Sequence, residues 1–224
     1  EISECLVGSE MCIRDSGKGA CALFGLPASG RAQVYAALCR QLDKPLCIVT
    51  PGEAEATRFA ADLNTLGIPA AVFPARDYVL RPIEGTAREY EYRRLSVLGA
   101  LAGGRLQAVC VPDEGLTQYT TPRAEFCANT RTLHPGDTVP RTELTALLYN
   151  AGYARRAQVD GPGQFSIRGD IVDLYAPDMK LPVRMEFWGD EIDTMHTFDL
   201  ATQRREDPIE KIYVSPAREV LFGS

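Results

Sequence analysis

A segment near the N-terminus, GLPASGRA at residues 25–32, has the spacing of a phosphate-binding loop but lacks two of its working side chains. The pattern requires a glycine, four residues, a second glycine, a lysine, and then serine or threonine. Gly25 and Gly30 keep the spacing, whereas Arg31 replaces the lysine and Ala32 replaces the hydroxyl residue that coordinates magnesium. The planar arginine fork is not a simple substitute for a lysine ammonium. We therefore expect a tight turn between a strand and a helix rather than ATP hydrolysis, with weak anion binding at the helix N-terminus as the alternative.

Other candidate catalytic or metal-binding groups are sparse. The stretch VCVPDEG, residues 109–115, resembles the apolar strand and acidic pair of a magnesium-binding motif, but Asp113 is more simply the N-cap of a helix. The seven cysteines contain no C-x-x-C pair, and His134 and His196 are far apart in the sequence. These residues predict reduced core thiols, no metal site and no nucleophilic triad.

A different kind of candidate site lies in LPVRMEFWGDE, residues 181–191. Because side chains alternate along a strand, three apolar residues point to one face and three other residues to the opposite face. The apolar set is Val183, Met185 and Phe187, and the opposite set is Arg184, Glu186 and Trp188. An exposed tryptophan beside an arginine favours a protein interface, which Arg168 joins if its strand is a neighbour. The alternative is that Arg184 pairs with Glu186 or Asp170 and that Trp188 covers the sheet edge.

The elements that position these residues fall into two groups. In the first half, strands alternate with helices, which predicts a parallel sheet covered on both faces. The expected strands are 20–26, 45–50, 70–74 and 106–112, and the expected helices are 31–42, 52–67 and 88–104. In the second half, one helix precedes strands that predict a mainly antiparallel sheet. That helix is 141–153, and those strands are 164–169, 170–176, 181–191, 192–199 and 210–217.

Composition fits a soluble cytoplasmic protein of 224 residues, 45% of them hydrophobic. The formal net charge of −6 argues against a protein that tracks a phosphate backbone, and no apolar run is long enough to span a membrane. Residues 1–16 fit no element and are expected to be a non-native or disordered extension. The domains that we predict are 17–125, an α/β domain with the degenerate phosphate loop; 126–215, an α+β domain; and 216–224, the start of a segment that returns to the first domain.

Several longer stretches carry a resemblance to a known family. They are AGYARRAQVDGPGQFSIRGDIVDLYAP, LPVRMEFWGDEIDTMHTFDLATQR and SPAREVLF, supported by GLPASGRA and REYEYRRL. From residue 17 onward the chain resembles the N-terminal region of the bacterial transcription-repair coupling factors (Mfd), which is itself similar to the first domains of the excision-repair protein UvrB. The resemblance implies a RecA/helicase-like domain with a degenerate P-loop, followed by a domain like the second domain of UvrB.

The resemblance also implies a function. In the family the second domain recruits UvrA through two arginines and an aromatic residue, which correspond here to Arg168, Arg184 and Trp188. The resemblance thus implies a non-catalytic module without a cofactor of its own. ATP, magnesium, RNA polymerase and double-stranded DNA are expected to bind other domains of the full protein. Nearby Asp170, Glu186 and Asp190 are expected to orient the arginines.

An alternative is a fragment of a UvrB-like, ATP-dependent DNA-repair enzyme. UvrB has an intact phosphate loop and a long damage-probing β-hairpin. The degenerate loop at residues 25–32 and the short loop at residues 75–87 favour the coupling factor instead. We also expect the first sheet to be incomplete, with some apolar surface uncovered.

Overall fold

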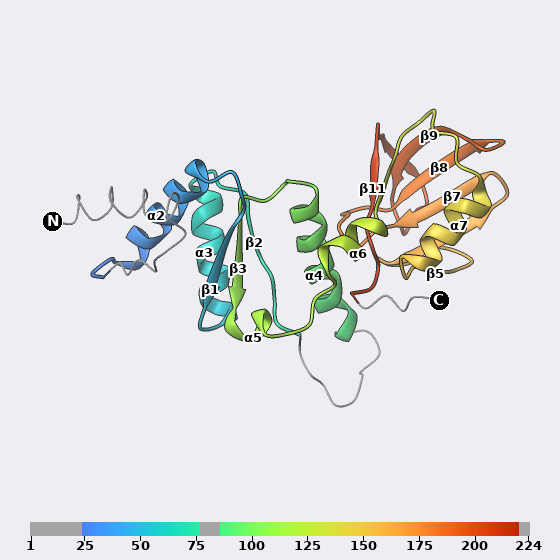
Figure 1. The fold of residues 1–224 in the computed structure, drawn as a ribbon. Coiled ribbons are helices and arrows are strands. Elements are labelled where there is room, and N and C mark those ends of the chain that lie inside the picture. The colour runs from blue at the N-terminus through green and yellow to red at the C-terminus, as the bar shows by residue number, and fades with distance from the viewer. Residues whose placement is uncertain (1–23, 77–85, 220–224) are drawn as a thin grey trace.

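The computed structural model describes residues 24–76 and 86–219. The described helices are α2 (Ala28–Gln41), α3 (Glu53–Thr65), α4 (Thr86–Ala102), α5 (Asp113–Leu116), α6 (Arg123–Ala128) and α7 (Arg141–Asn150). The described strands are β1 (Leu46–Thr50), β2 (Ala70–Val72), β3 (Ala108–Pro112), β4 (Arg131–Leu133), β5 (Ala154–Arg155), β6 (Gln164–Arg168), β7 (Ile171–Tyr175), β8 (Val183–Trp188), β9 (Glu191–Phe198), β10 (Arg205–Pro208) and β11 (Ile212–Val214). These strands form a three-stranded sheet in the first sheet system, and a six-stranded and a two-stranded sheet (β11-β4) that share one core in the second sheet system. Helices α4 and α6 lie between the two systems (Figure 1).

The first sheet is parallel, as the alternating pattern predicts, with strand order β1-β3-β2. Ala108 of the central strand β3 lies opposite Leu46 of β1 on one side and Ala70 of β2 on the other. All five residues of β3 are buried. A continuous apolar run is expected of a strand that is hydrogen-bonded on both sides and covered on both faces.

Helices cover the two faces of the first sheet unequally. Residues of α2 and α3 form a core cluster with Ile48 and Cys110, while α4 packs on the other side against Val109 and Val111. On β1, Cys47 and Val49 are exposed, and 51% of Val49 is accessible to solvent. The expectation of incompletely covered apolar surface is therefore met at β1.

Local sequence accounts for the bounds of α3. Its first turn carries Glu53 and Glu55, whose charges favour the positive end of the helix dipole. Its end is set by Gly67, which has φ of 78° and donates its N–H to the carbonyl oxygen of Asn64 over 3.0 Å. Glycine adopts this left-handed conformation without the steric penalty of a side chain, so the helix stops near the predicted residue.

The second sheet has six strands in the order β10-β9-β8-β7-β6-β5. Neighbouring strands are antiparallel except β5 and β6, which are parallel. One face packs against α7 through Leu144 and Leu148, which are buried with Phe165, Val172 and Met185. The predicted α+β arrangement, one helix against a mainly antiparallel sheet, is confirmed.

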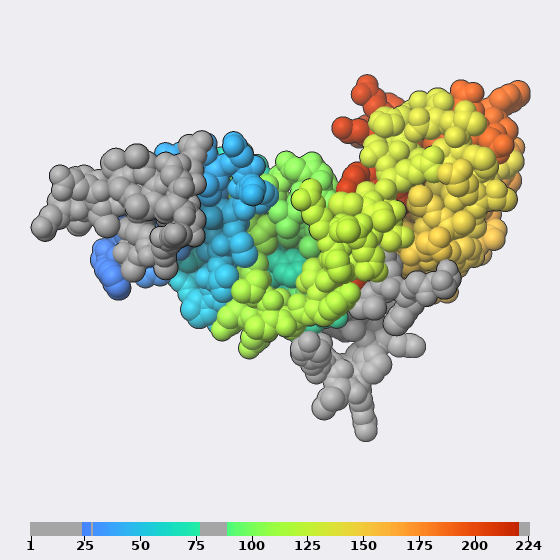
Figure 2. Space-filling view, in the orientation of Figure 1, coloured from blue at the N-terminus to red at the C-terminus, as the bar shows by residue number. Residues whose placement is uncertain are grey.

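Beyond the second sheet, the chain contacts the first sheet system again. The carboxylate of Glu219 is fully buried and is paired with Arg94 of α4 at 2.8 Å and with Arg76 at 2.7 Å. Arg94 also donates to the carbonyl oxygen of Pro74 over 2.8 Å, and its guanidinium lies 4.0 Å from the centre of the Phe73 ring. This buried ion cluster fixes the segment after β11 against the first sheet system, and the space-filling view shows the chain around α6 filling the region between the two systems (Figure 2).

Three sequence expectations need correction. Phe24–Leu26, the described part of the strand expected at 20–26, is not a strand. Asp113 is the first residue of α5, so Pro112 holds the N-cap position and Asp113 does not. The sequence analysis also missed four short elements: β4, β5, β10 and α6.

Some expectations fall on residues outside those described. These are the extension 1–16, most of the loop 75–87 and the last residues of the return segment 216–224. The boundary expected between residues 125 and 126 falls within α6 and stays a prediction.

Candidate functional site

The candidate site is the outer face, defined as the face of the six-stranded sheet opposite α7 that carries Arg168, Asp173, Arg184 and Trp188. Strand β8 alternates as its sequence predicts. Val183 and Met185 are fully buried on the α7 side, and Arg184 and Trp188 point to the outer face. The α7 face is therefore occupied by core packing, which leaves the outer face available for contacts with other molecules.

Trp188 stands at the end of β8, opposite Glu191 of β9, and is 84% exposed. The turn that follows contains Gly189 with φ of 64°. Because β8 lies inside the sheet between β7 and β9, the tryptophan does not cover a sheet edge. The alternative in which Trp188 covers the sheet edge is therefore wrong. A tryptophan ring packed on an edge would lose most of its exposed area, whereas Trp188 has lost little.

The two arginines share one buried carboxylate. Asp173 of β7 lies directly opposite Arg184 of β8, and its side chain is 1% exposed. Arg184 donates from Nε to Oδ1 of Asp173 over 2.6 Å and from Nη2 to Oδ2 over 2.9 Å. Arg168, at the end of β6, donates from Nη2 to Oδ2 over 2.6 Å. The fold therefore brings Arg168 and Arg184 together around Asp173.

Arg184 is further held by the turn after β9. Its guanidinium lies 4.5 Å from the centre of the Phe198 ring and donates to the side-chain oxygen of Gln203 over 3.1 Å. Gln203 has φ of 58°, a conformation that is uncommon for residues other than glycine. The hydrogen bond to Asp173 raises the pKa of Arg184, so this side chain stays charged throughout the ordinary pH range.

The acidic partners expected from sequence are not the ones found. Asp170 binds Arg141 of α7 at 2.7 Å, and Glu186 pairs with Arg205 of β10. Asp190 forms no ion pair with Arg168 or Arg184 within the described ranges. Those expectations, and the alternative that Arg184 pairs with Glu186 or Asp170, are wrong. Asp173 holds both arginines because it is the cross-strand neighbour of Arg184.

Sequence reasoning missed Asp173, although a signal for it was present. In DIVDLYA the buried residues Val172 and Leu174 flank Asp173, which places the carboxylate on the face opposite the core. Two arginines were already expected on that face. What the sequence lacked was the register, which decides which acid lies opposite Arg184.

His196 is a second buried polar residue of the outer face. It lies opposite Arg184 across β8 and β9, is 5% exposed, and its Nε2 has no hydrogen-bond partner among the described residues. The nearest carboxylate oxygen, Oε1 of Glu186, is 4.0 Å away. Burial and the neighbouring charge of Arg184 lower the pKa of His196, which keeps the ring neutral near pH 7.

The degenerate phosphate loop lacks the lysine and the hydroxyl side chain that a nucleotide site needs. Helix α2 already begins at Ala28, and the N–H of Arg31 donates to the carbonyl oxygen of Pro27 over 3.1 Å. Ala32 is 2% exposed, so a hydroxyl at this position would point into the core. A side chain on Gly30 would begin 3.3 Å from Cδ of Pro27, a close contact that favours glycine at this position.

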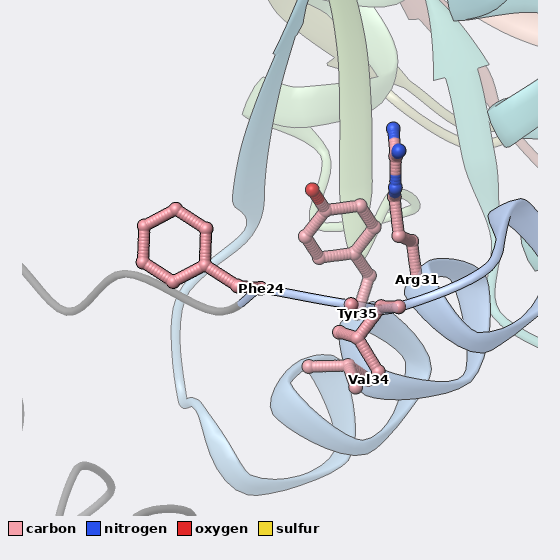
Figure 3. A pocket seen from close by; sticks show the side chains of 6 residues that line it. Phe24, Arg31, Val34 and Tyr35 are labelled. Atoms are coloured by element: carbon pink, nitrogen blue, oxygen red, sulfur yellow. The ribbon is translucent and has the colours of Figure 1, made fainter.

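An open hollow of about 400 Å³ lies beside this turn. Figure 3 shows Arg31 and Tyr35 extending in the same direction from α2, with Phe24 on the opposite side of the hollow. The Arg31 guanidinium lies 3.6 Å from a carboxylate oxygen of Glu55, which already balances its charge. ATP with magnesium would find here neither a lysine nor a hydroxyl ligand, so the residues do not fit that group.

Residues 24–76 and 86–219 contain neither a candidate metal centre nor a helix that could cross a membrane. No three His, Cys, Asp or Glu side chains in these ranges are grouped so that they could hold a metal ion. The helices in the same ranges include none with the length and apolar character needed to cross a membrane.

The second sheet system is similar to a known protein family. Residues 132–220 match the family described as the UvrB interaction domain. The match begins in β4 and ends just after the buried Glu219, so it includes the whole outer face.

The chain as a whole is similar to transcription-repair-coupling factors. It is 28% identical over 202 residues to that of Bacillus subtilis, which covers 89% of this chain and 17% of the relative. It is 29% identical over 200 residues to that of Staphylococcus haemolyticus, with 88% and 17% covered. The chain spans about one sixth of the length of these relatives. These similarities confirm the resemblance to the coupling factors.

Proposed function

We propose that this chain is a non-catalytic adaptor module that recruits UvrA and thereby links stalled transcription to nucleotide excision repair. Trp188, 84% exposed on the sheet face that also carries Arg168 and Arg184, is the observation that carries the proposal. A tryptophan in water on a regular strand gains free energy when a partner covers it, and Trp and Arg are the residues most enriched at the energetic centres of interfaces.

The outer face suits a protein partner because it is ordered before binding. Arg168 and Arg184 are held by Asp173 through hydrogen bonds of 2.6 to 2.9 Å. Ordering a free arginine side chain on binding costs conformational entropy, and the ion cluster has already restricted both side chains. Strands β6, β7 and β8 form the inner part of the sheet, so the residues are presented on a rigid surface.

The comparisons support the same partner. The matched family bears the name of the UvrB interaction domain, and the relatives are named transcription-repair-coupling factors. We propose that UvrA contacts Arg168, Arg184 and Trp188. RNA polymerase, double-stranded DNA, ATP and magnesium would bind other parts of the full protein. This chain would act in the cytoplasm and would need no cofactor of its own.

A UvrB-like, ATP-dependent enzyme is the second function that the sequence leaves open. It requires nucleotide binding at Gly30 and Arg31. The buried Ala32 and the ion pair between Arg31 and Glu55 argue against it. Saturable binding of a fluorescent ATP analogue that depends on Arg31 would restore this alternative.

Calorimetric titration of UvrA with the chain tests the proposal. Trp188→Ala is expected to weaken binding by about 2 kcal/mol, because a central aromatic anchor is removed. A matched control is Tyr119→Ala, which removes an aromatic ring that is 59% exposed in the first sheet system. Equal affinities of the wild type, Trp188→Ala and a variant lacking both Arg168 and Arg184 side chains would overturn the site.

A further inference from the structure

We infer that Asp173 is the positioning residue of the outer face: its buried carboxylate holds Arg168 in the orientation in which that arginine meets an acceptor group of the partner. The inference rests on the proposed function for the partner. The orientation of Arg168 by Asp173 can be tested without the partner.

One carboxylate serves two cations. Oδ1 of Asp173 accepts from Arg184, and Oδ2 accepts from both Arg184 and Arg168. Asp173 is 1% exposed, so the charge is withdrawn from water and depends on these two partners for its stabilisation. Loss of the Asp173 charge therefore removes the one hydrogen-bonding partner that Arg168 has among the described residues, whereas Arg184 keeps Gln203.

The two arginines are bound to different extents. Arg184 is 12% exposed and makes four hydrogen bonds, two with Asp173 and two with Gln203. A guanidinium has five N–H donors, so Arg184 has little capacity left for a partner unless the turn at Gln203 moves. Its main contribution in this arrangement is to fix Asp173.

Arg168 is the arginine with free donors. It is 46% exposed, and within the described residues its guanidinium makes one hydrogen bond, to Asp173. The remaining donors are open to solvent on the face that carries Trp188. A carboxylate or a main-chain carbonyl of the partner suits these donors, because a planar guanidinium fork binds such oxygens directionally.

The division of roles gives Asp173 an effect that a purely structural acid would not have. A structural acid would change stability and leave affinity alone once the protein is folded. A positioning acid changes the affinity through Arg168, so its effect disappears when Arg168 is absent. The two cases can be separated by a double-mutant cycle.

The experiment uses the 224-residue chain with purified UvrA. Asp173→Asn keeps the side-chain shape and removes the charge, and it is expected to weaken binding about tenfold. In an Arg168→Ala background the same substitution is expected to change affinity less than about twofold, because Arg184 keeps its contacts with Gln203 and Phe198. The matched control is Asp178→Asn, which removes another buried carboxylate, 4% exposed and paired with Arg105 at 2.9 Å, away from the outer face.

A second readout needs no partner. The nitrogen-15 NMR signal of the Arg168 side chain is expected to shift and narrow toward that of a free arginine in Asp173→Asn, and to stay unchanged in Asp178→Asn. If Asp173→Asn does not fold, the double variant Asp173→Asn with Arg184→Gln removes the charge and its counter-charge together and makes the same test.

Three outcomes would overturn the inference: unchanged affinity of Asp173→Asn for UvrA, losses that add in the Arg168→Ala background, or an unchanged Arg168 signal. A wild-type chain that does not bind UvrA would refute the proposed function instead. In that case the NMR signal alone decides whether Asp173 orders Arg168.

Discussion

Asp173 and Arg184 lie directly opposite each other on β7 and β8, and the arginine Nε donates to the aspartate Oδ1 over 2.6 Å. The aspartate is 1% exposed and the arginine 12%. This ion pair links two neighbouring strands, and it also orients Arg184 on the outer face. The stability of the sheet and the orientation of the interaction residues thus depend on the same contact.

Removal of the Arg184 side chain should destabilise the chain more than removal of the Arg168 side chain. Arg184→Ala leaves the buried Asp173 with Arg168 as its only arginine partner and is expected to lower the free energy of unfolding by about 3 kcal/mol. Arg168→Ala removes a side chain that is 46% exposed and is expected to cost less than about 1 kcal/mol. Urea unfolding followed by circular dichroism measures both, and equal losses would contradict the assigned pairing.

The single tryptophan provides an optical test of the outer face. Since Trp188 is 84% exposed, the fluorescence of the free chain should be that of a water-exposed indole, with a shift to shorter wavelength when UvrA covers it. Trp188→Phe is the control, since it should retain binding in calorimetry while the fluorescence change is lost. Emission of a buried indole in the free chain would contradict the exposed position.

His196 should make stability depend on pH. Its pKa is lowered in the folded state by burial and by Arg184, so the unfolded chain binds a proton more readily. The groups around it are Arg184, Asp173 and Glu186. The stabilisation is therefore present above the ordinary histidine pKa of 6.5 and is lost as the pH falls below it.

The measurement is the free energy of unfolding at about pH 7.5 and about pH 5.5. The wild type should lose more stability over this interval than His196→Gln, in which no imidazole titrates. His134→Gln is the matched control, because His134 has an exposed side chain beside Asp137. A wild-type loss equal to that of His196→Gln would show that other groups carry the dependence.

The buried cluster of Glu219, Arg94 and Arg76 should be essential for stability. Glu219→Gln leaves the fully buried Arg94 without its anionic partner and is expected to cost about 3 to 5 kcal/mol. Glu143→Gln is the control, because Glu143 pairs with Arg131 at the surface with 56% of its side chain exposed. Thermal unfolding should separate the two variants widely, and similar midpoints would refute the cluster.

Restoring the phosphate-loop residues should not restore nucleotide binding. Arg31→Lys with Ala32→Ser completes the motif, yet position 32 is 2% exposed and its side chain faces the core. The buried hydroxyl is expected to cost about 1 kcal/mol, and binding of a fluorescent ATP analogue should remain absent. Saturable binding by this variant would mean that the loop can still adopt its nucleotide-binding form.

Much of the fold follows from local sequence. Gly67 ends α3 because glycine tolerates the left-handed conformation, and the alternation of Val183, Arg184 and Met185 determines which side chains face α7. These features depend on residues a few positions apart. The short elements β5 and β10 lack such a signal, because they owe their strand form to pairing with β6 and β9.

The sequence by itself determined the two sheet types, the outward direction of Arg184 and Trp188, and the loss of the lysine and hydroxyl in the phosphate loop. Only the tertiary structure decided that Asp173, rather than Asp170, Glu186 or Asp190, holds the arginines. Strand register is fixed by packing of the whole sheet against α7, and a shift of two residues would preserve the alternation while changing every cross-strand partner. The pattern of a strand therefore identifies its exposed face, whereas the identity of its ion pairs depends on strands elsewhere in the chain.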